Sequence, residues 1–205
     1  MFFVQSCAVC NAETESGVFC PACRSSELLL EAMPGLLNLD GAVMGYKYSG
    51  ALKDMLHKLK FEGESKFLQP LAEEAVFLAQ AYGESCLDMV VSVPTDAARR
   101  RQRGFDIPES IFAGALAVKG TWQPQVLARI KATAPQYGLA PDKRRSNVRG
   151  CFEVRGSVSG AKILLVDDIL TTGATLDEAA KTLKQAGAKS VYALTLCGSL
   201  ENFKE

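Results

Sequence analysis

The sequence predicts a doubly wound α/β fold with a mainly parallel central sheet and a small cysteine-rich knuckle at the N-terminus. Three apolar runs, at residues 89–93, 163–166 and 191–196, are continuous and rich in β-branched side chains. Such runs are typical of strands that are covered on both faces. A helical stretch at residues 174–186, ended by Gly187, lies between the last two runs and completes a βαβ unit. Four of the seven cysteines fall within the first 23 residues.

The remaining elements follow from periodicity and from turn residues. Apolar side chains recur at helical spacing in residues 50–59 and 68–81, and a proline near the start favours a helix at 107–118. Residues 42–48 predict a short strand or hairpin arm. We interpret residues 28–39 as a linker that packs on the main domain, because Pro34 and Gly35 interrupt a leucine-rich stretch. We therefore expect a knuckle in residues 1–27 and one domain in residues 28–205.

Composition limits the classes of function. The 205 residues are 48% apolar and 22% charged, which is ordinary for a soluble globular chain. Lys+Arg and Asp+Glu are equal at 23 each, so no net charge draws the whole protein to nucleic acid or anionic lipid. The N-terminus has no signal-peptide pattern, and no apolar run approaches the roughly 20 residues that span a bilayer. We expect a cytoplasmic protein without a membrane span.

The most informative motif runs from residue 163 to residue 175, where a buried strand leads into two acids, a loop of hydroxyl residues and glycine, and a helix. Backbone N–H groups at the start of the helix favour an anion, and the threonine hydroxyls add donors. Gly173 has no Cβ, so a phosphate oxygen can approach the backbone closely. Two adjacent carboxylates can accept hydrogen bonds from vicinal ribose hydroxyls. The motif predicts a ribose 5-phosphate site made of these residues: Asp167, Asp168, Thr171, Thr172, Gly173, Ala174 and Thr175.

Two other interpretations of the Val-Asp-Asp sequence are a Walker B acid and a phospho-acceptor site. The chain contains no G-x-x-x-x-G-K-[ST] phosphate loop, which argues against a nucleotide hydrolase. A plain strand-to-helix turn needs only one capping residue, and this loop offers far more.

The motif resembles the 5-phosphoribosyl 1-pyrophosphate (PRPP) signature of type I phosphoribosyltransferases, and nearly the whole chain resembles the ComF/GntX-like family of bacterial proteins. The resemblance rests on the cysteine knuckle, the signature and several polar positions. Those positions are Val91-Ser92-Val93-Pro94, Arg99, Arg100, Arg103-Gly104-Phe105, Thr133, Gln136, Leu139, Arg144 and Asn147-Val148-Arg149-Gly150.

The resemblance implies a pyrophosphate loop around Pro94, Thr95 and Asp96 after the first buried strand. It also implies that the basic run with Arg99, Arg100 and Arg103 offsets pyrophosphate charge, while Mg²⁺ bridges the ligand's oxygens. A flexible loop at residues 129–150 would close over the substrate and bring Gln136 and Arg144 to it. The catalytic candidates are Asp167, Asp168, Gln136 and Arg144.

The chain departs from the family pattern at two places. Asp106 and Ile107 stand where the family usually has Asn-Gln after Gly-Phe, and Lys131 stands where Arg is usual. The first change removes amide groups near the pyrophosphate side.

The resemblance leaves three functions open: transfer of a phosphoribosyl group to an acceptor that the sequence does not identify, PRPP sensing without turnover, and DNA uptake in natural transformation through binding of single-stranded DNA. Oligomeric state has no sequence signal.

The four N-terminal cysteines form two C-x-x-C knuckles, Cys7 with Cys10 and Cys20 with Cys23. This spacing lets four thiolates converge on one tetrahedral metal, and zinc is the predicted ion. Iron in a rubredoxin-like site and redox-active thiols are the alternatives. A site closed by four cysteines has a structural role, and we expect the α/β domain to persist when the knuckle loses its metal.

Overall fold

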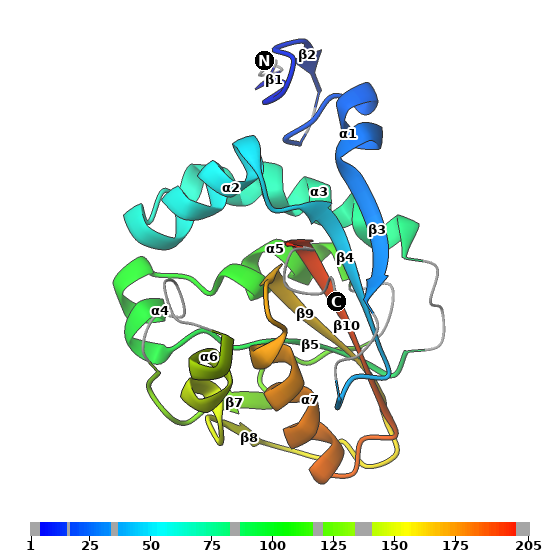
Figure 1. Ribbon diagram of the computed structural model, residues 1–205, viewed down its shortest axis with the longest axis vertical. Coiled ribbons are helices and arrows are strands. Elements are labelled where there is room, and N and C mark those ends of the chain that lie inside the picture. The colour runs from blue at the N-terminus through cyan, green and yellow to red at the C-terminus, as the bar shows by residue number, and fades with distance from the viewer. Residues whose placement is uncertain are drawn as a thin grey trace.

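The structure, a computed structural model, describes residues 5–15, 17–33, 37–82, 87–116, 121–133 and 141–199. Within them, six strands form a central sheet in the order β3-β4-β10-β9-β5-β6 (Figure 1). All neighbours in this sheet run parallel except β3 and β4, which are antiparallel. The strands are β3 (Leu28–Met33), β4 (Gly41–Lys47), β5 (Met89–Ser92), β6 (Thr121–Trp122), β9 (Lys162–Leu170) and β10 (Ser190–Gly198). The predicted parallel α/β sheet is confirmed.

Helices cover both faces of the sheet. On one face lie α2 (Gly50–His57), α3 (Leu68–Ala81) and α5 (Ile107–Leu116), whose apolar sides pack against β9 and β10 in one core. On the other face lie α7 (Ala174–Gln185) and the small hairpin of β7 (Leu127–Arg129) and β8 (Phe152–Val154). Because both faces are covered, Ile163, Leu164, Leu165 and Val166 of β9 are all fully buried. This explains the non-alternating apolar run in the sequence.

Residues 28–33 are not a linker, as the sequence suggested, but the edge strand β3, which pairs antiparallel with β4. The pairing shifts register between Leu28 and Glu31, and Leu30 has a positive φ of 42°. The irregular register explains why no regular alternation marks this strand in the sequence. Because β3 directly follows α1, the end of the knuckle lies at the edge of the main sheet.

Two further helices and two short helical turns complete the described part of the main domain. The helix α4 (Ala97–Arg103) follows β5, and α6 (Pro141–Val148) lies beside α7 (Figure 1). A π-helical turn, Lys58–Glu62, continues α2 and ends at Gly63. A 3₁₀ turn, Ser65–Phe67, leads into α3. The crevice at the carboxyl ends of the parallel strands is where ligands bind in open α/β sheets.

The N-terminal knuckle consists of the short strands β1 (Gln5–Ser6) and β2 (Glu13–Thr14) and the helix α1 (Pro21–Glu27). It sits above α3, at one end of the molecule (Figure 1). No helix in the described part of the chain has the length and apolar character needed to cross a membrane.

Candidate functional site

The loop between β9 and α7 forms a small pocket at the carboxyl edge of the sheet. The pocket measures about 20 Å³ and is lined by Asp167, Thr171, Thr172, Gly173, Ala174 and Thr175, among others. Gly173 caps α7 in the left-handed conformation, with φ 72°, and its carbonyl accepts the N–H of Asp177 as the helix begins. The first N–H groups of an α-helix have no carbonyl partner within the helix. The positive end of the α7 dipole therefore lies at this pocket.

The two acids of the motif lie within β9 rather than after it, because β10 continues to pair with β9 as far as Leu170. They have different surroundings. Asp167 lines the pocket with the loop residues, and its Oδ1 accepts the N–H of Asp168. Burial, followed by the negative charge of Asp168, raises the pKa of Asp167 well above its ordinary range. Asp168 does not line this pocket, and its carboxylate is engaged elsewhere in the protein.

The partner of Asp168 is Lys60, a residue that the sequence analysis did not select. The Nζ of Lys60 donates to Oδ1 of Asp168 over 2.8 Å. Burial alone would lower the pKa of Lys60, but the carboxylate of Asp168, aided by Asp167, raises it. Lys60 lies 108 positions before Asp168, just after the amphipathic helical pattern of residues 50–59, and no local signal in the sequence marks it.

The segment after β5 holds the residues expected at a pyrophosphate loop. Thr95 donates its backbone N–H to Oδ2 of the buried Asp106 over 2.8 Å, and Asp96 caps α4 by accepting the N–H groups of Ala98 and Arg99. A second cavity of about 170 Å³ adjoins this segment, and Thr95 and Asp106 are among its lining residues. Burial raises the pKa of Asp106, and the N–H bond from Thr95 acts against that shift.

The three arginines predicted to face pyrophosphate all lie on α4, at the carboxyl end of β5, and each has a partner in the protein. Arg99 donates to the carbonyl of Thr133 over 2.9 Å, and Arg100 lies 3.5 Å from Glu109 in an ion pair. Arg103 donates its Nε to the carbonyl of Lys60 over 2.8 Å. Burial lowers the pKa of Arg103. The basic run therefore lies on the short helix that follows β5.

The segment expected as a flexible loop, residues 129–150, contains the end of β7 and the helix α6. This corrects the expectation of a loop for its second half. Arg144 lies on α6. At the end of the segment, the backbone N–H of Gly150 donates to Oε1 of Glu178 on α7 over 2.8 Å. The structure does not place Arg144 among the residues that line the pocket. Gln136 lies outside the described residues.

The four N-terminal cysteines converge. Their Sγ atoms all lie within 4.8 Å of one another, and those of Cys10 and Cys20 are 3.7 Å apart. Tetrahedral zinc with Zn–S bonds of about 2.3 Å requires sulfur atoms about 3.8 Å apart, so the group fits such an ion. Burial opposes ionisation of Cys7, but N–H groups of Cys10, Cys20 and Val9 outweigh it and lower the pKa of the Cys7 thiol to about 6. The donor set therefore suits a metal ion.

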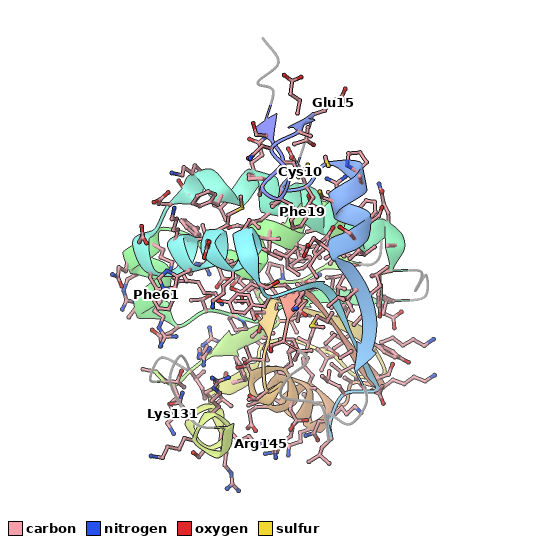
Figure 2. The ribbon with its side chains drawn as sticks, turned by 45° about the horizontal axis from the view of Figure 1, so that its top comes forward. Cys10, Glu15, Phe19, Phe61, Lys131 and Arg145 are labelled. Atoms are coloured by element: carbon pink, nitrogen blue, oxygen red, sulfur yellow. The ribbon has the colours of Figure 1, made fainter. Side chains whose placement is uncertain are left out.

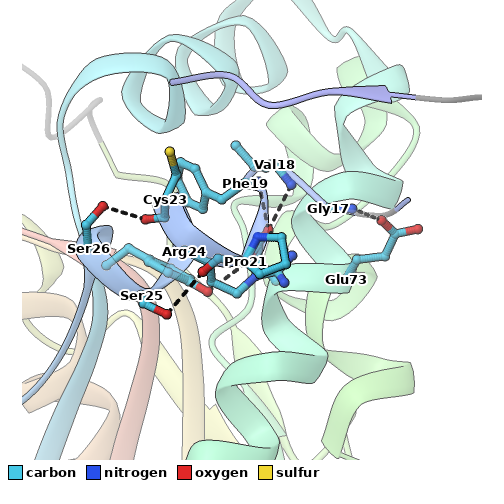
Figure 3. A network of polar contacts seen from close by, with 11 residues as sticks. Gly17, Val18, Phe19, Pro21, Cys23, Arg24, Ser25, Ser26 and Glu73 are labelled. Atoms are coloured by element: carbon cyan, nitrogen blue, oxygen red, sulfur yellow. Dashed lines mark hydrogen bonds and ion pairs between the residues drawn. The ribbon is translucent and has the colours of Figure 1, made fainter. Parts of the chain in front are cut away.

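The knuckle is joined to the main domain by the buried carboxylate of Glu74 on α3. Its Oε1 accepts the N–H groups of Val18 over 2.8 Å and Phe19 over 3.2 Å, and its Oε2 accepts Nε of Arg24 over 2.8 Å. Tyr46, on β4, donates its hydroxyl to Oε2 over 2.7 Å. Nearby, Gly17 donates its N–H to Glu73 (Figure 3). The two C-x-x-C elements therefore flank a segment, residues 17–19, whose backbone N–H groups bind carboxylates of α3.

Residues 117–204 match the phosphoribosyl transferase domain family. The DNA utilization protein YhgH of Salmonella typhimurium is 32% identical over 158 residues, which cover 75% of this chain and 70% of that protein. The chain belongs to the ComF/GntX-like family. The competence protein ComFC of Streptococcus pneumoniae is 29% identical over 186 residues, covering 86% of this chain and 79% of that protein. YhgH of Escherichia coli K12 is 29% identical over 209 residues, covering 95% of this chain and 90% of that protein.

Asp106, where this chain departs from the pattern of the ComF/GntX-like family, accepts hydrogen bonds from two backbone N–H groups. Its side chain starts α5 by accepting the N–H of Glu109 over 3.4 Å, and it also holds the Thr95 N–H. The same side chain therefore accepts an N–H at the start of α5 and occupies one backbone donor of the segment after β5. Lys131 is exposed, and nothing in the structure explains its replacement of arginine.

Proposed function

We propose that this protein binds PRPP with Mg²⁺ in the crevice at the carboxyl ends of β9 and β5, and transfers its phosphoribosyl group to an acceptor with release of pyrophosphate. The observation that carries the proposal is the pocket in which Asp167 meets the 171–175 loop at the start of α7. A carboxylate for ribose hydroxyls and a helix terminus for a phosphate are present side by side.

Each part of the ligand has a counterpart among these residues. The 5-phosphate would accept hydrogen bonds from backbone N–H groups and hydroxyls of the 171–175 loop, because the α7 dipole favours an anion there. The carboxylate of Asp167 would accept hydrogen bonds from the ribose. The arginines of α4 would offset pyrophosphate charge from the side of β5. Mg²⁺, which prefers oxygen ligands and keeps several waters, would be held mainly by PRPP oxygens and would reduce the charge on the leaving group.

The first experiment is isothermal titration of the protein with PRPP in the presence of Mg²⁺. Asp167→Asn should weaken binding, because a hydrogen bond to a charged acceptor contributes roughly 1.5–3 kcal/mol. Asp54→Asn, an exposed acid on α2, is the matched control and should bind as the wild type does. Equal affinity of the Asp167 variant and the wild type would contradict the ribose assignment. Measuring pyrophosphate release against candidate acceptors then separates an enzyme from a PRPP sensor.

We propose that the four cysteines hold one structural Zn²⁺ per chain. Four thiolates leave no open position, so the ion would stabilise the knuckle rather than bind substrate. So short a segment cannot bury enough surface to fold without a metal. Elemental analysis of purified protein distinguishes zinc from iron.

A second function, binding of single-stranded DNA, is favoured by the distribution of basic residues and by the names of the relatives, which refer to DNA utilization and competence. Exposed basic side chains are carried by α4 and α6 and the segments next to them: Arg101, Lys131, Lys143, Arg145 and Arg149. Lys131 and Arg145 project from the part of the molecule away from the knuckle (Figure 2). Binding through these groups should weaken steeply with salt. Lys143→Gln with Arg145→Gln should reduce both the affinity for an oligonucleotide and its salt dependence while PRPP binding is unchanged.

A further inference from the structure

Lys60 makes an ion pair that packing alone does not require. Its Nζ lies 2.8 Å from Oδ1 of Asp168, and only 9% of the Asp168 side chain and 25% of the Lys60 side chain are exposed. Removing an ammonium and a carboxylate from water costs free energy that apolar side chains in the same space would not, so a largely buried pair is weak evidence for a role in stability and points to another role. The pair lies at the strand end where Asp167 lines the pocket.

The backbone that carries Lys60 is unusual. Lys60 stands in the middle of the π-helical turn Lys58–Glu62, which stops at Gly63 with φ 70°. Single π turns inside helices are rare and occur often at functional sites. The carbonyl of Lys60 accepts Nε of Arg103 from α4 over 2.8 Å. Lys60 is thus held at both ends, with its side chain on β9 and its carbonyl on the helix that follows the pyrophosphate loop.

The electrostatic surroundings explain what a cation at this position does. Asp167 and Asp168 are adjacent, and the carboxylate of Asp168 opposes ionisation of Asp167. The titratable groups that act on Asp167 are Asp168 on its own strand, Lys60 on the π turn and Asp106 before α5, and Cys197 on β10 is affected by both acids. Of these groups, Lys60 is the one that favours the charged form of Asp167.

We infer that Lys60 is a positioning residue of the proposed PRPP site: it pairs with and orients Asp168, and its positive charge beside the two adjacent acids favours Asp167 as an acceptor for the ribose hydroxyls. Through its carbonyl it also fixes Arg103, and so couples the ribose side of the crevice to the pyrophosphate side. The inference rests on the proposed function. It assigns a role to a residue that lies outside the signature motif and outside the basic run.

The first test needs no ligand. In protein labelled with ¹³C at aspartate carboxyl carbons, the NMR titration of Asp167 should move to higher pH in Lys60→Met, because the neighbouring cation is lost. Lys58→Met, an exposed lysine on the same π turn, is the matched control and should leave the titration where it is. A midpoint in Lys60→Met that equals the wild-type midpoint would overturn the inference.

The second test is binding. Lys60→Met should weaken Mg²⁺–PRPP about tenfold at pH 7, and its affinity should begin to fall at a higher pH than that of the wild type as the solution is acidified. Lys60→Arg should recover part of the affinity, and Lys58→Met should bind as the wild type does. If the wild type binds and Lys60→Met binds equally well at every pH, the inference alone is overturned. If the wild type does not bind Mg²⁺–PRPP, the proposed function fails and the inference fails with it.

Discussion

Asp106 places a carboxylate where a polyanion is proposed to bind. The residue is 5% exposed, and its side chain accepts the N–H of Thr95, a backbone donor of the loop that is proposed to bind pyrophosphate. Burial raises its pKa, which shows that the charged form is disfavoured at this position. Asparagine has nearly the same shape, keeps an oxygen that can accept the Thr95 N–H, and carries no charge.

Asp106→Asn is therefore expected to strengthen binding of Mg²⁺–PRPP, by about three- to tenfold, because one negative charge near the pyrophosphate is removed. Calorimetry with PRPP measures the gain. Ribose 5-phosphate, which lacks the pyrophosphate, is the control ligand and should bind both proteins equally. Equal gains for the two ligands would place the effect on the fold of the loop rather than on its charge, and weaker PRPP binding would contradict the prediction outright.

The strand, loop and helix around residues 163–175 show what could be predicted at the scale of elements. The buried run and the Thr-Thr-Gly-Ala-Thr sequence predicted β9 and α7 because both signals are local. The continuation of β9 through Asp167 and Asp168 was not predicted, since it depends on pairing with β10. Residues 28–33 were wrongly taken as a linker because only their pairing with β4 makes them a strand.

The same distinction applies to the site residues. Asp167 and the 171–175 loop could be found because they lie close together in the sequence and form one recognisable motif for a ribose 5-phosphate. Lys60 could not be found, because its contact with Asp168 is made by the packing of α2 on the sheet. The helix α6 was missed because its residues, Pro141–Val148, are almost all polar and have no apolar stripe that would predict a helix.

At the start of α7, Gly173 adopts φ 72°, a conformation that costs an L-residue with a Cβ roughly 1–2 kcal/mol. Gly173→Ala should therefore lower stability by that amount and also weaken PRPP binding, because the loop that approaches the phosphate is displaced. Gly160, also at φ 72° and with nothing within 4 Å of its Cβ position, is a matched control far from the pocket.

Gly160→Ala should show the same loss of stability in urea unfolding with unchanged affinity for PRPP. The pair of variants separates backbone strain, which both share, from closeness to the ligand, which only Gly173 has. Equal affinities of the two variants for PRPP would contradict the placement of the 5-phosphate at this loop.

For the whole molecule, the central question is whether the knuckle and the α/β domain fold independently. The sequence suggested that they do, with a boundary after residue 27, and that boundary stays a prediction. The structure gives a reason to expect coupling. Glu74 is fully buried in the main domain, yet three of its hydrogen-bond partners, Val18, Phe19 and Arg24, belong to the knuckle. Among the described residues, the hydrogen-bond partner that would remain if the knuckle unfolded is Tyr46 on β4.

Removal of the metal should therefore destabilise the α/β domain as well. Unfolding of the knuckle leaves the Glu74 carboxylate without the guanidinium and two N–H groups, and breaking a buried pair costs about 3–5 kcal/mol. For a chain of this size, that corresponds to a fall in Tm of roughly 10 °C. Differential scanning calorimetry with a chelator, compared with excess Zn²⁺, measures the fall in the main transition.

The variant Glu74→Gln tests whether the effect runs through this carboxylate. With metal bound it should be less stable than the wild type, and chelation should then lower its Tm by less, because no buried charge is left unpaired. Glu73→Gln is the matched control: among the described residues of the knuckle it bonds Gly17, from a partly exposed position, and chelation should affect it as it affects the wild type. A main transition that does not move on chelation in any of the three proteins would show that the two parts fold independently.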